Sequence, residues 1–155
     1  MSNAFMQRAI EMAIENVRQR GGGPFGAVVV KGGHIIAEGA NRVTSTNDPT
    51  AHAEVVAIRA ACQSLGHFQL DGCEIYTSCL PCPMCLGAIY WARPERVYYA
   101  STEKDAAAAG FDDSFIYREL ALPPADRRIP LIPLMREASL KAFEVWKNTP
   151  GRIEY

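Results

Sequence analysis

The segment TSCLPCPMC, residues 77–85, constrains the fold of this chain most strongly, because it joins the end of an apolar strand to the start of a helix. Residues 73–77 predict the short strand. Pro83 suits the first helical position, where its missing N–H would be unpaired in any case, and this makes Cys82 the expected N-cap. Cys85 follows on the same helix face, and both sulfurs lie near the positive end of the helix dipole, which favours thiolates. We therefore expect the pair to hold a metal ion.

The five cysteines allow several uses, which the residues alone leave open. Their odd number, in a chain without a secretory signal pattern, is poor support for a disulfide framework. Cys79 precedes the helix and could be a fourth ligand, which would close the site into a purely structural zinc knot. A redox pair of the Cys-x-x-Cys type is a related alternative. Cys62 and Cys73 fall in apolar surroundings and are expected to be buried structural thiols.

A second polar pair, His52 and Glu54, stands near the start of another predicted helix, residues 50–65, with Thr50 as its expected N-cap. Residues two apart on a helix point about 200° from each other, so the two side chains cannot share a site on its flank. First-turn side chains can converge beyond the helix end, however. We therefore place the site where the starts of the two helices meet.

His52, Cys82 and Cys85 then supply three ligands. One nitrogen and two sulfurs suit zinc, and three protein ligands leave the fourth tetrahedral position open for water. Bound zinc can bring the pKa of water from 15.7 to about 7. Glu54, close to the metal without binding it, can take the water proton and pass it to a ring nitrogen and then to a leaving amine.

The rest of the chain predicts a single α/β domain over residues 1–155. Residues 1–4 (MSNA) resemble an expression scar and receive no structural weight. Gly32-Gly33 joins two β-branched runs as a hairpin. The other expected elements are a helix over residues 5–19, a polar loop over 42–48, a strand over 96–100 and a tail helix over 137–147.

Charge and hydropathy exclude two classes of partner. The chain has 16 Lys and Arg against 17 Asp and Glu and no basic cluster, which argues against nucleic acid. No window holds the roughly 18 consecutive apolar residues of a membrane span, and no signal core follows the N-terminus. We therefore expect a cytoplasmic protein without membrane partners.

The motifs carry a family resemblance. His52-Ala53-Glu54 with Pro81-Cys82-Pro83-Met84-Cys85 is the signature of zinc-dependent nucleobase deaminases. The chain resembles the cytidine deaminase superfamily and, within it, the small bacterial guanine deaminases. The resemblance rests on GGPFGAVVVK, GANRVTSTNDPTAHAEV, PCPMCLGAIYWARP, AAGFDDSFIY and the closing Glu-Tyr.

That resemblance implies a cytidine-deaminase-like, three-layer α/β/α fold with a mixed five-stranded sheet. It also implies that guanine and water become xanthine and ammonia, in purine catabolism or nitrogen salvage. The subgroup further implies homodimers in which the C-terminal segment helps to close an active site. FDDSFIY and Tyr155 are the features that single out guanine, a small purine base, as substrate.

Roles for single residues follow from the same resemblance. His52, Cys82 and Cys85 would bind Zn²⁺, and Glu54 would be the proton shuttle. Asn41 matches a position that hydrogen-bonds the base, and Asp113 matches a position near the purine pocket. The amide of Asn41 can both donate and accept hydrogen bonds, whereas the carboxylate of Asp113 can only accept them. The other matching positions near the purine pocket are Trp91 and Tyr155.

Leu80 departs from the pattern, because many superfamily members have Glu before the Pro-Cys pair. A supporting hydrogen bond would then be missing, and substrate rate or preference would differ. The alternative enzyme is a tRNA adenosine deaminase or another nucleobase deaminase. A tRNA enzyme needs a basic surface, and the last stretch, FEVWKNTPGRIEY, is not strongly basic. A non-catalytic zinc or thiol protein is the alternative from another class.

Overall fold

The computed structural model describes residues 3–155. The chain divides into two compact units, Met1–Ser114 and Phe115–Tyr155, and each is described by itself. The single domain expected over residues 1–155 stays a prediction. Within residues 3–155 we find no helix with the length and apolar character that a membrane span requires.

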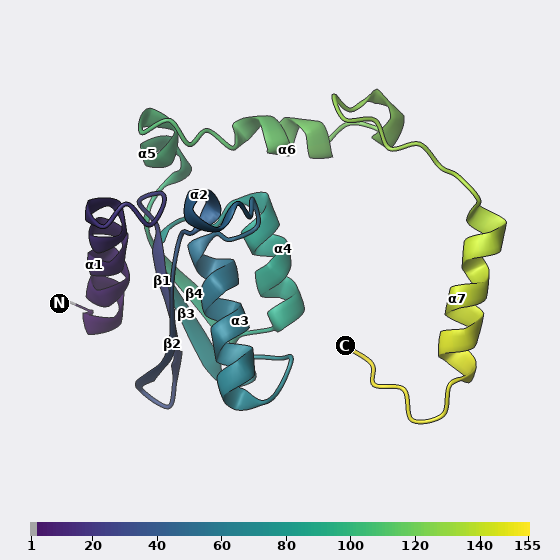
Figure 1. Cartoon of the computed structure of the whole chain (residues 1–155), viewed down its shortest axis with the longest axis horizontal. Coiled ribbons are helices and arrows are strands. Elements are labelled where there is room, and N and C mark those ends of the chain that lie inside the picture. Colours follow the sequence, from purple (N-terminus) through teal and green to yellow (C-terminus); the bar gives the residue numbers. More distant parts are fainter. Residues whose placement is uncertain (1–2) are drawn as a thin grey trace. The chain divides into compact units, whose positions relative to one another are not determined.

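The first unit contains a mixed sheet whose four strands run in the order β2-β1-β3-β4 (Figure 1). The strands are β1 (Gly26–Lys31), β2 (His34–Ala40), β3 (Cys73–Cys79) and β4 (Arg96–Ser101). β1 is antiparallel to both β2 and β3, whereas β3 and β4 are parallel. The predicted Gly32-Gly33 hairpin is confirmed, and both glycines adopt the positive φ that a tight hairpin turn requires.

The prediction of five strands is wrong, because the sheet of the described residues ends at β4. The chain after β4 turns directly into α5 (Glu103–Ala108), which begins with a capping box. The later irregular stretch, residues 129–134, contains Pro130 and Pro133. Proline has no N–H to give to a strand ladder, so this stretch is poorly suited to pairing within a sheet.

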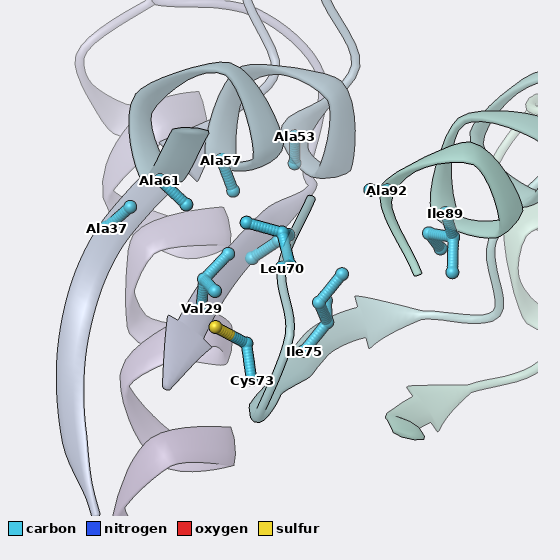
Figure 2. Packing of buried hydrophobic residues seen from close by; sticks show 11 residues of the cluster. Val29, Ala37, Ala53, Ala57, Ala61, Leu70, Cys73, Ile75, Ile89 and Ala92 are labelled. Carbon is cyan, nitrogen blue, oxygen red and sulfur yellow. The ribbon is translucent and has the colours of Figure 1, made fainter. Parts of the chain in front are cut away.

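Helices cover both faces of the sheet, as the expected three layers require (Figure 1). α1 (Ala4–Arg18) packs on one face, and α3 (Ala53–Leu65) and α4 (Pro83–Ala92) on the other. Figure 2 shows the larger core, between the sheet and these two helices. Its buried members are small and apolar: Ala27, Val29, Ala37, Ala53, Ala57, Ala61, Leu70, Cys73, Ile75, Ile89 and Ala92.

Two glycines let helices approach the sheet closely. A Cβ on Gly26 would overlap the backbone oxygen of Ala9 in α1, and a Cβ on Gly39 would overlap that of Ala53 in α3. The two glycines lie on neighbouring strands, since Ala27 pairs with Gly39. α1 and α3 therefore pack on opposite faces of the sheet so closely that only glycine fits at these two positions.

Asn3 and Ala4 take part in α1, although residues 1–4 received no structural weight in the sequence analysis. The Asn3 side chain accepts hydrogen bonds from the N–H groups of Phe5 and Met6, and Ala4 is the first helical residue. An asparagine N-cap satisfies N–H groups that would otherwise have no partner. Met1 and Ser2 lie outside the described residues.

The second unit is helical. It contains α6 (Ser114–Leu120) from its second residue onward, the short 3₁₀ helix η1 (Pro124–Asp126) and α7 (Arg136–Asn148). The tail helix expected over residues 137–147 is thereby confirmed as α7.

Candidate zinc and active site

The site forms where the first turns of α3 and α4 meet. Cys82 is the N-cap of α4 and Pro83 its first residue, as predicted. α3 begins at Ala53 with His52 as N-cap, so the expected N-cap at Thr50 is wrong. Asp48 explains the difference, because its carboxylate accepts from the N–H and the hydroxyl of Thr50 and holds that residue in a turn.

The three predicted ligands lie together. His52 Nδ1 is 3.5 Å from Cys82 Sγ and 3.4 Å from Cys85 Sγ. Zinc–nitrogen and zinc–sulfur bonds at a tetrahedral angle put the two donor atoms about 3.6 Å apart. Within residues 3–155 these three form a group of potential metal ligands, all within 4.8 Å of one another. Their distances and donor types therefore fit zinc.

The cysteine pair is electrostatically coupled. The hydrogen bond from Cys85, assisted by His52, lowers the pKa of Cys82 to about 4. The same hydrogen bond, together with burial and the nearby Glu54, raises the pKa of Cys85 far above its usual range. The bond to Cys82 also raises the pKa of His52. Without metal, the two sulfurs thus share one proton, which a metal ion must displace.

Glu54 is buried beside the ligands, with only 6% of its surface exposed. Its Oε1 accepts a hydrogen bond from Thr77 Oγ1 at 3.1 Å, and its Oε2 lies 3.4 Å from Cys85 Sγ. Burial is the main cause that raises the pKa of this carboxyl group, and its hydrogen bonds partly offset that effect. The result is a carboxyl group, next to the metal ligands, whose pKa lies above its usual range, as is common for groups that transfer protons in active sites.

Asn41 follows β2 and is buried. Its Oδ1 accepts from the N–H groups of Gly23 and Val43, at 3.1 and 3.2 Å. The amide orientation follows from these two donors, so its NH₂ group is directed away from them. The next residue, Arg42, donates its N–H to Ala51, directly before His52. This bond ties the end of β2 to the loop that carries the histidine ligand.

Asp113 is half-buried in the loop after α5. Its pKa is raised, mainly by burial and to a smaller extent by the negative charge of Cys82. The loop is anchored by Phe111, whose ring meets that of Phe25 edge to face with centroids 5.0 Å apart. The geometry thus brings Asp113 within electrostatic reach of the ligand cluster.

Trp91 and Tyr155 were also predicted to lie near the purine pocket. Trp91 is in the last turn of α4, about 12 Å along the helix axis from Pro83, and its side chain is largely exposed. Tyr155 belongs to the second unit and is exposed as well. Their places at the purine pocket stay predictions.

Cys79 lies outside the ligand group. It is the last residue of β3, and its thiol lies 3.6 Å from the backbone oxygen of Thr102. Burial raises its pKa to about 11, so it holds its proton. Leu80, at the position where many superfamily members have Glu, is half-buried and donates its N–H to Ser101.

Two polar residues near the site were missed in the sequence. Thr77 is completely buried beside Glu54, and Asn16 is buried where its amide donates to the backbone oxygens of Gly23 and Asn41. For each residue, the alternation of polar and apolar positions in the sequence could have indicated its burial. Thr77 is polar on a strand face shared with Cys73 and Ile75, and Asn16 is polar in the buried stripe of α1.

The chain matches known proteins over its whole length. The family model described as the cytidine and deoxycytidylate deaminase zinc-binding region matches residues 1–101. Guanine deaminase of Bacillus subtilis (strain 168) is 58% identical over 151 residues, which cover 97% of each chain. The X-ray structure of the B. subtilis guanine deaminase superposes with a TM-score of 0.97 at 57% identity, over 100% of this chain and 99% of that one.

A second group of relatives matches a smaller part. The tRNA-specific adenosine deaminase of Agrobacterium fabrum (strain C58 / ATCC 33970) is 41% identical over 104 residues, 67% of this chain and 68% of its own. The structure of guanine deaminase from Nitrosomonas europaea has a TM-score of 0.67 at 32% identity, over 90% of this chain and 71% of that one.

Proposed function

Because the chain belongs to the cytidine and deoxycytidylate deaminase zinc-binding family, we propose that it catalyses the hydrolytic deamination of guanine to xanthine and ammonia. The likeness to a guanine deaminase carries the choice of substrate, since it extends over 97% of the chain. The match to a tRNA-specific adenosine deaminase covers only 67%.

The chemistry divides among the residues of the site. His52, Cys82 and Cys85 would hold zinc, which when bound lowers the pKa of the attacking water. Glu54 would take one proton from that water and deliver it to a ring nitrogen, and then take the remaining proton from the hydroxyl on the ring carbon and deliver it to the departing amine. Its burial keeps bulk water from competing for the proton. The two protons of the water thus end on the base and on ammonia, and its oxygen remains on the ring carbon.

Recognition of the base would use the polar groups around the ligands. The NH₂ group of Asn41 can donate to a carbonyl or ring nitrogen of guanine, and the carboxylate of Asp113 can accept from a ring N–H. Trp91 and Tyr155 complete the proposed pocket. A site built on such bonds can reject a wrongly substituted base by around 10⁴-fold, because an analogue leaves buried groups unpaired.

Ammonia release tests this function directly. The zinc-loaded chain should release ammonia from free guanine and leave adenosine in a tRNA anticodon loop unchanged. Xanthine formation at the same rate, followed by its absorbance, identifies the product. Activity on the tRNA alone would replace guanine deamination with the second enzyme class.

We also propose a cytoplasmic homodimer in which the C-terminal segment contributes to an active site. Each unit has exposed apolar side chains, which support contact with a partner subunit. Tyr90 in the first unit is 75% exposed, and Ile132 and Leu134 in the second are 80% and 84% exposed. Sedimentation should give twice the mass of the chain. Cell fractionation tests the location.

Co-expression of two defective chains distinguishes how the segment acts. A Glu54→Gln chain lacks the shuttle, and a Tyr155→Ala chain lacks the terminal ring. If each tail serves the partner, a mixed dimer contains one intact site and regains activity. If each tail serves its own chain, the mixed dimer stays as inactive as the two parents.

A further inference from the structure

The hydroxyl of Thr77 is a polar group deep in the first unit that the proposed reaction has not yet used. Thr77 lies on β3, and no part of it is exposed. Its Oγ1 is 3.1 Å from Glu54 Oε1 and 3.2 Å from the backbone oxygen of Cys79. A buried hydroxyl is costly to place in a core unless it is hydrogen-bonded, so these two contacts explain how it is accommodated.

The contacts also distinguish the two oxygens of Glu54. Oε2 lies 3.4 Å from Cys85 Sγ, on the side of the metal ligands, whereas Oε1 faces Thr77. The carboxyl torsion of glutamate is broad, so packing alone would leave the group able to rotate. A hydrogen bond to Oε1 limits that rotation and keeps Oε2 directed towards the ligands.

We propose that Thr77 is a positioning residue, whose hydroxyl holds Glu54 with Oε2 directed towards the metal and the substrate. This inference rests on the proposed deamination. Thr77 does not act on the base itself: it acts through the carboxyl group that moves the protons.

The hydroxyl suits a proton shuttle because it can both donate and accept. A threonine has one hydroxyl hydrogen, and here two acceptors lie within reach. While Glu54 is ionised, that hydrogen is donated to Oε1. While Oε2 holds the proton taken from the water, Oε1 still accepts from the same hydroxyl, so the contact is kept throughout the transfer. Neither state leaves a buried polar group of Glu54 or Thr77 unpaired.

A role limited to filling space is the alternative. Valine has nearly the shape of threonine and lacks the hydroxyl, so Thr77→Val separates the two roles. Thr77→Ser keeps the hydroxyl and loses a methyl group. Ile75→Val is a matched control, since it removes a methyl group from the same face of the same strand and leaves the hydroxyl of Thr77 in place.

The experiment compares these zinc-loaded variants with the unsubstituted chain on guanine, with rates normalised to bound zinc. For Thr77→Val we expect kcat to fall about 10- to 100-fold, the effect of losing one hydrogen bond to a charged group. KM should change by less than about threefold, since Thr77 is not proposed to touch the base. Thr77→Ser and Ile75→Val should stay within about threefold of the unsubstituted kcat, and all variants should bind one zinc per chain.

A crystal structure of zinc-loaded Thr77→Val provides a readout besides activity. We expect the Glu54 carboxyl group to be rotated or disordered there. An unchanged carboxyl position, or a kcat equal to that of the unsubstituted chain, would overturn the role of Thr77. Should Thr77→Val fail to fold, Thr77→Ala and Thr77→Ser make the comparison with smaller side chains, and equal kcat values for that pair would overturn it too.

The two proposals fail in different ways. If the unsubstituted chain does not deaminate guanine, the proposed function falls, while the carboxyl position in Thr77→Val still decides what Thr77 does. If the unsubstituted chain is active and Thr77→Val matches it, only the role of Thr77 falls.

Discussion

Cysteines only three residues apart in this chain have opposite environments. Cys82 and Cys85 share a proton at the start of α4, whereas the thiol of Cys79 faces a backbone oxygen and keeps its proton. A metal ion binds thiolates, so the first pair is suited to zinc and Cys79 is not.

Serine substitutions test this division of roles. Cys79→Ser should retain one zinc per chain, measured by atomic absorption after dialysis. Cys85→Ser, the matched control from the same segment, should lose most of its zinc, because it removes one of three ligands. Loss of zinc from Cys79→Ser would support the closed, structural zinc site instead.

Replacing Glu54 by glutamine separates metal binding from proton transfer. Glu54→Gln should keep zinc, since Glu54 is not in the ligand group, and lose at least about 100-fold in kcat because an amide cannot shuttle protons. Zinc content and steady-state rates on guanine measure both effects. A near-normal kcat would remove Glu54 from the mechanism.

Replacing Asn41 by aspartate tests the direction of its hydrogen bonds. Asn41→Asp can still accept from Gly23 and Val43, so the melting temperature should change little. The group proposed to contact the base becomes an acceptor instead of a donor, and kcat/KM for guanine should fall about 100-fold. An unchanged kcat/KM would show that Asn41 serves only the loop.

Local spacing explains which site residues could be predicted. The ligands come from two short motifs, and Pro83 fixes where one of them begins, so His52, Cys82 and Cys85 were predictable. Thr77 meets Glu54 across 23 positions of sequence, and Asn16 meets Asn41 across 25. Contacts between such distant positions depend on the tertiary fold, which no local pattern contains.

At the scale of elements, an ion pair joins α1 to β2. Arg8 donates through two nitrogens to both carboxylate oxygens of Glu38, at 2.7 and 2.9 Å. The hydrogen bond from Arg8 lowers the pKa of Glu38 below its ordinary 4.5. A group with a lowered pKa stabilises the fold above its ordinary pKa, and that stability is lost as pH falls through the folded-state pKa.

The stability of Glu38→Gln should therefore depend on pH. At pH 7 the variant should lose about 0.5–1 kcal/mol of unfolding free energy, the small value expected for a partly exposed pair. At a pH below the lowered folded-state pKa of Glu38 the two proteins should converge, because Glu38 is then protonated in both the folded and the unfolded chain. Urea titrations at both pH values measure this, and a constant difference would exclude the ion pair as its cause.

Element types were more predictable than element ends. Periodicity was enough for α1, α7 and the hairpin, and Pro83 gave the start of α4. The start of α3 was misplaced because Thr50 and His52 could both have been its N-cap. The hydrogen bond from Thr50 to Asp48 keeps Thr50 in a turn before the helix, so His52 is the N-cap. The fifth strand came from resemblance alone.

At the scale of the whole molecule, zinc should couple to both stability and pH. Metal that binds only the folded chain adds about 2.7 kcal/mol of unfolding free energy at 100 times its Kd. Cys85 holds its proton in the metal-free chain, since its pKa is raised, and zinc must displace that proton. Zinc affinity should thus rise with pH.

Two measurements check this coupling. Zinc added to the weakly buffered, metal-free chain should release at least one proton per ion, measured with an indicator dye. Thermal melting should occur at a higher temperature with zinc than with a chelator. Affinity that does not change between about pH 6 and pH 8, where metal-free Cys85 holds its proton, would contradict the coupling.

The close approach of α3 to Gly39 bears on how new substrates could arise in this architecture. The zinc-binding end of the helix rests on the sheet through backbone contact, so its packing does not require the loop around residues 110–113. That loop can accept insertions and substitutions while the hydrolytic machinery stays fixed. Evolution, or a protein engineer, could thereby redirect one reaction to a different amino-bearing heterocycle.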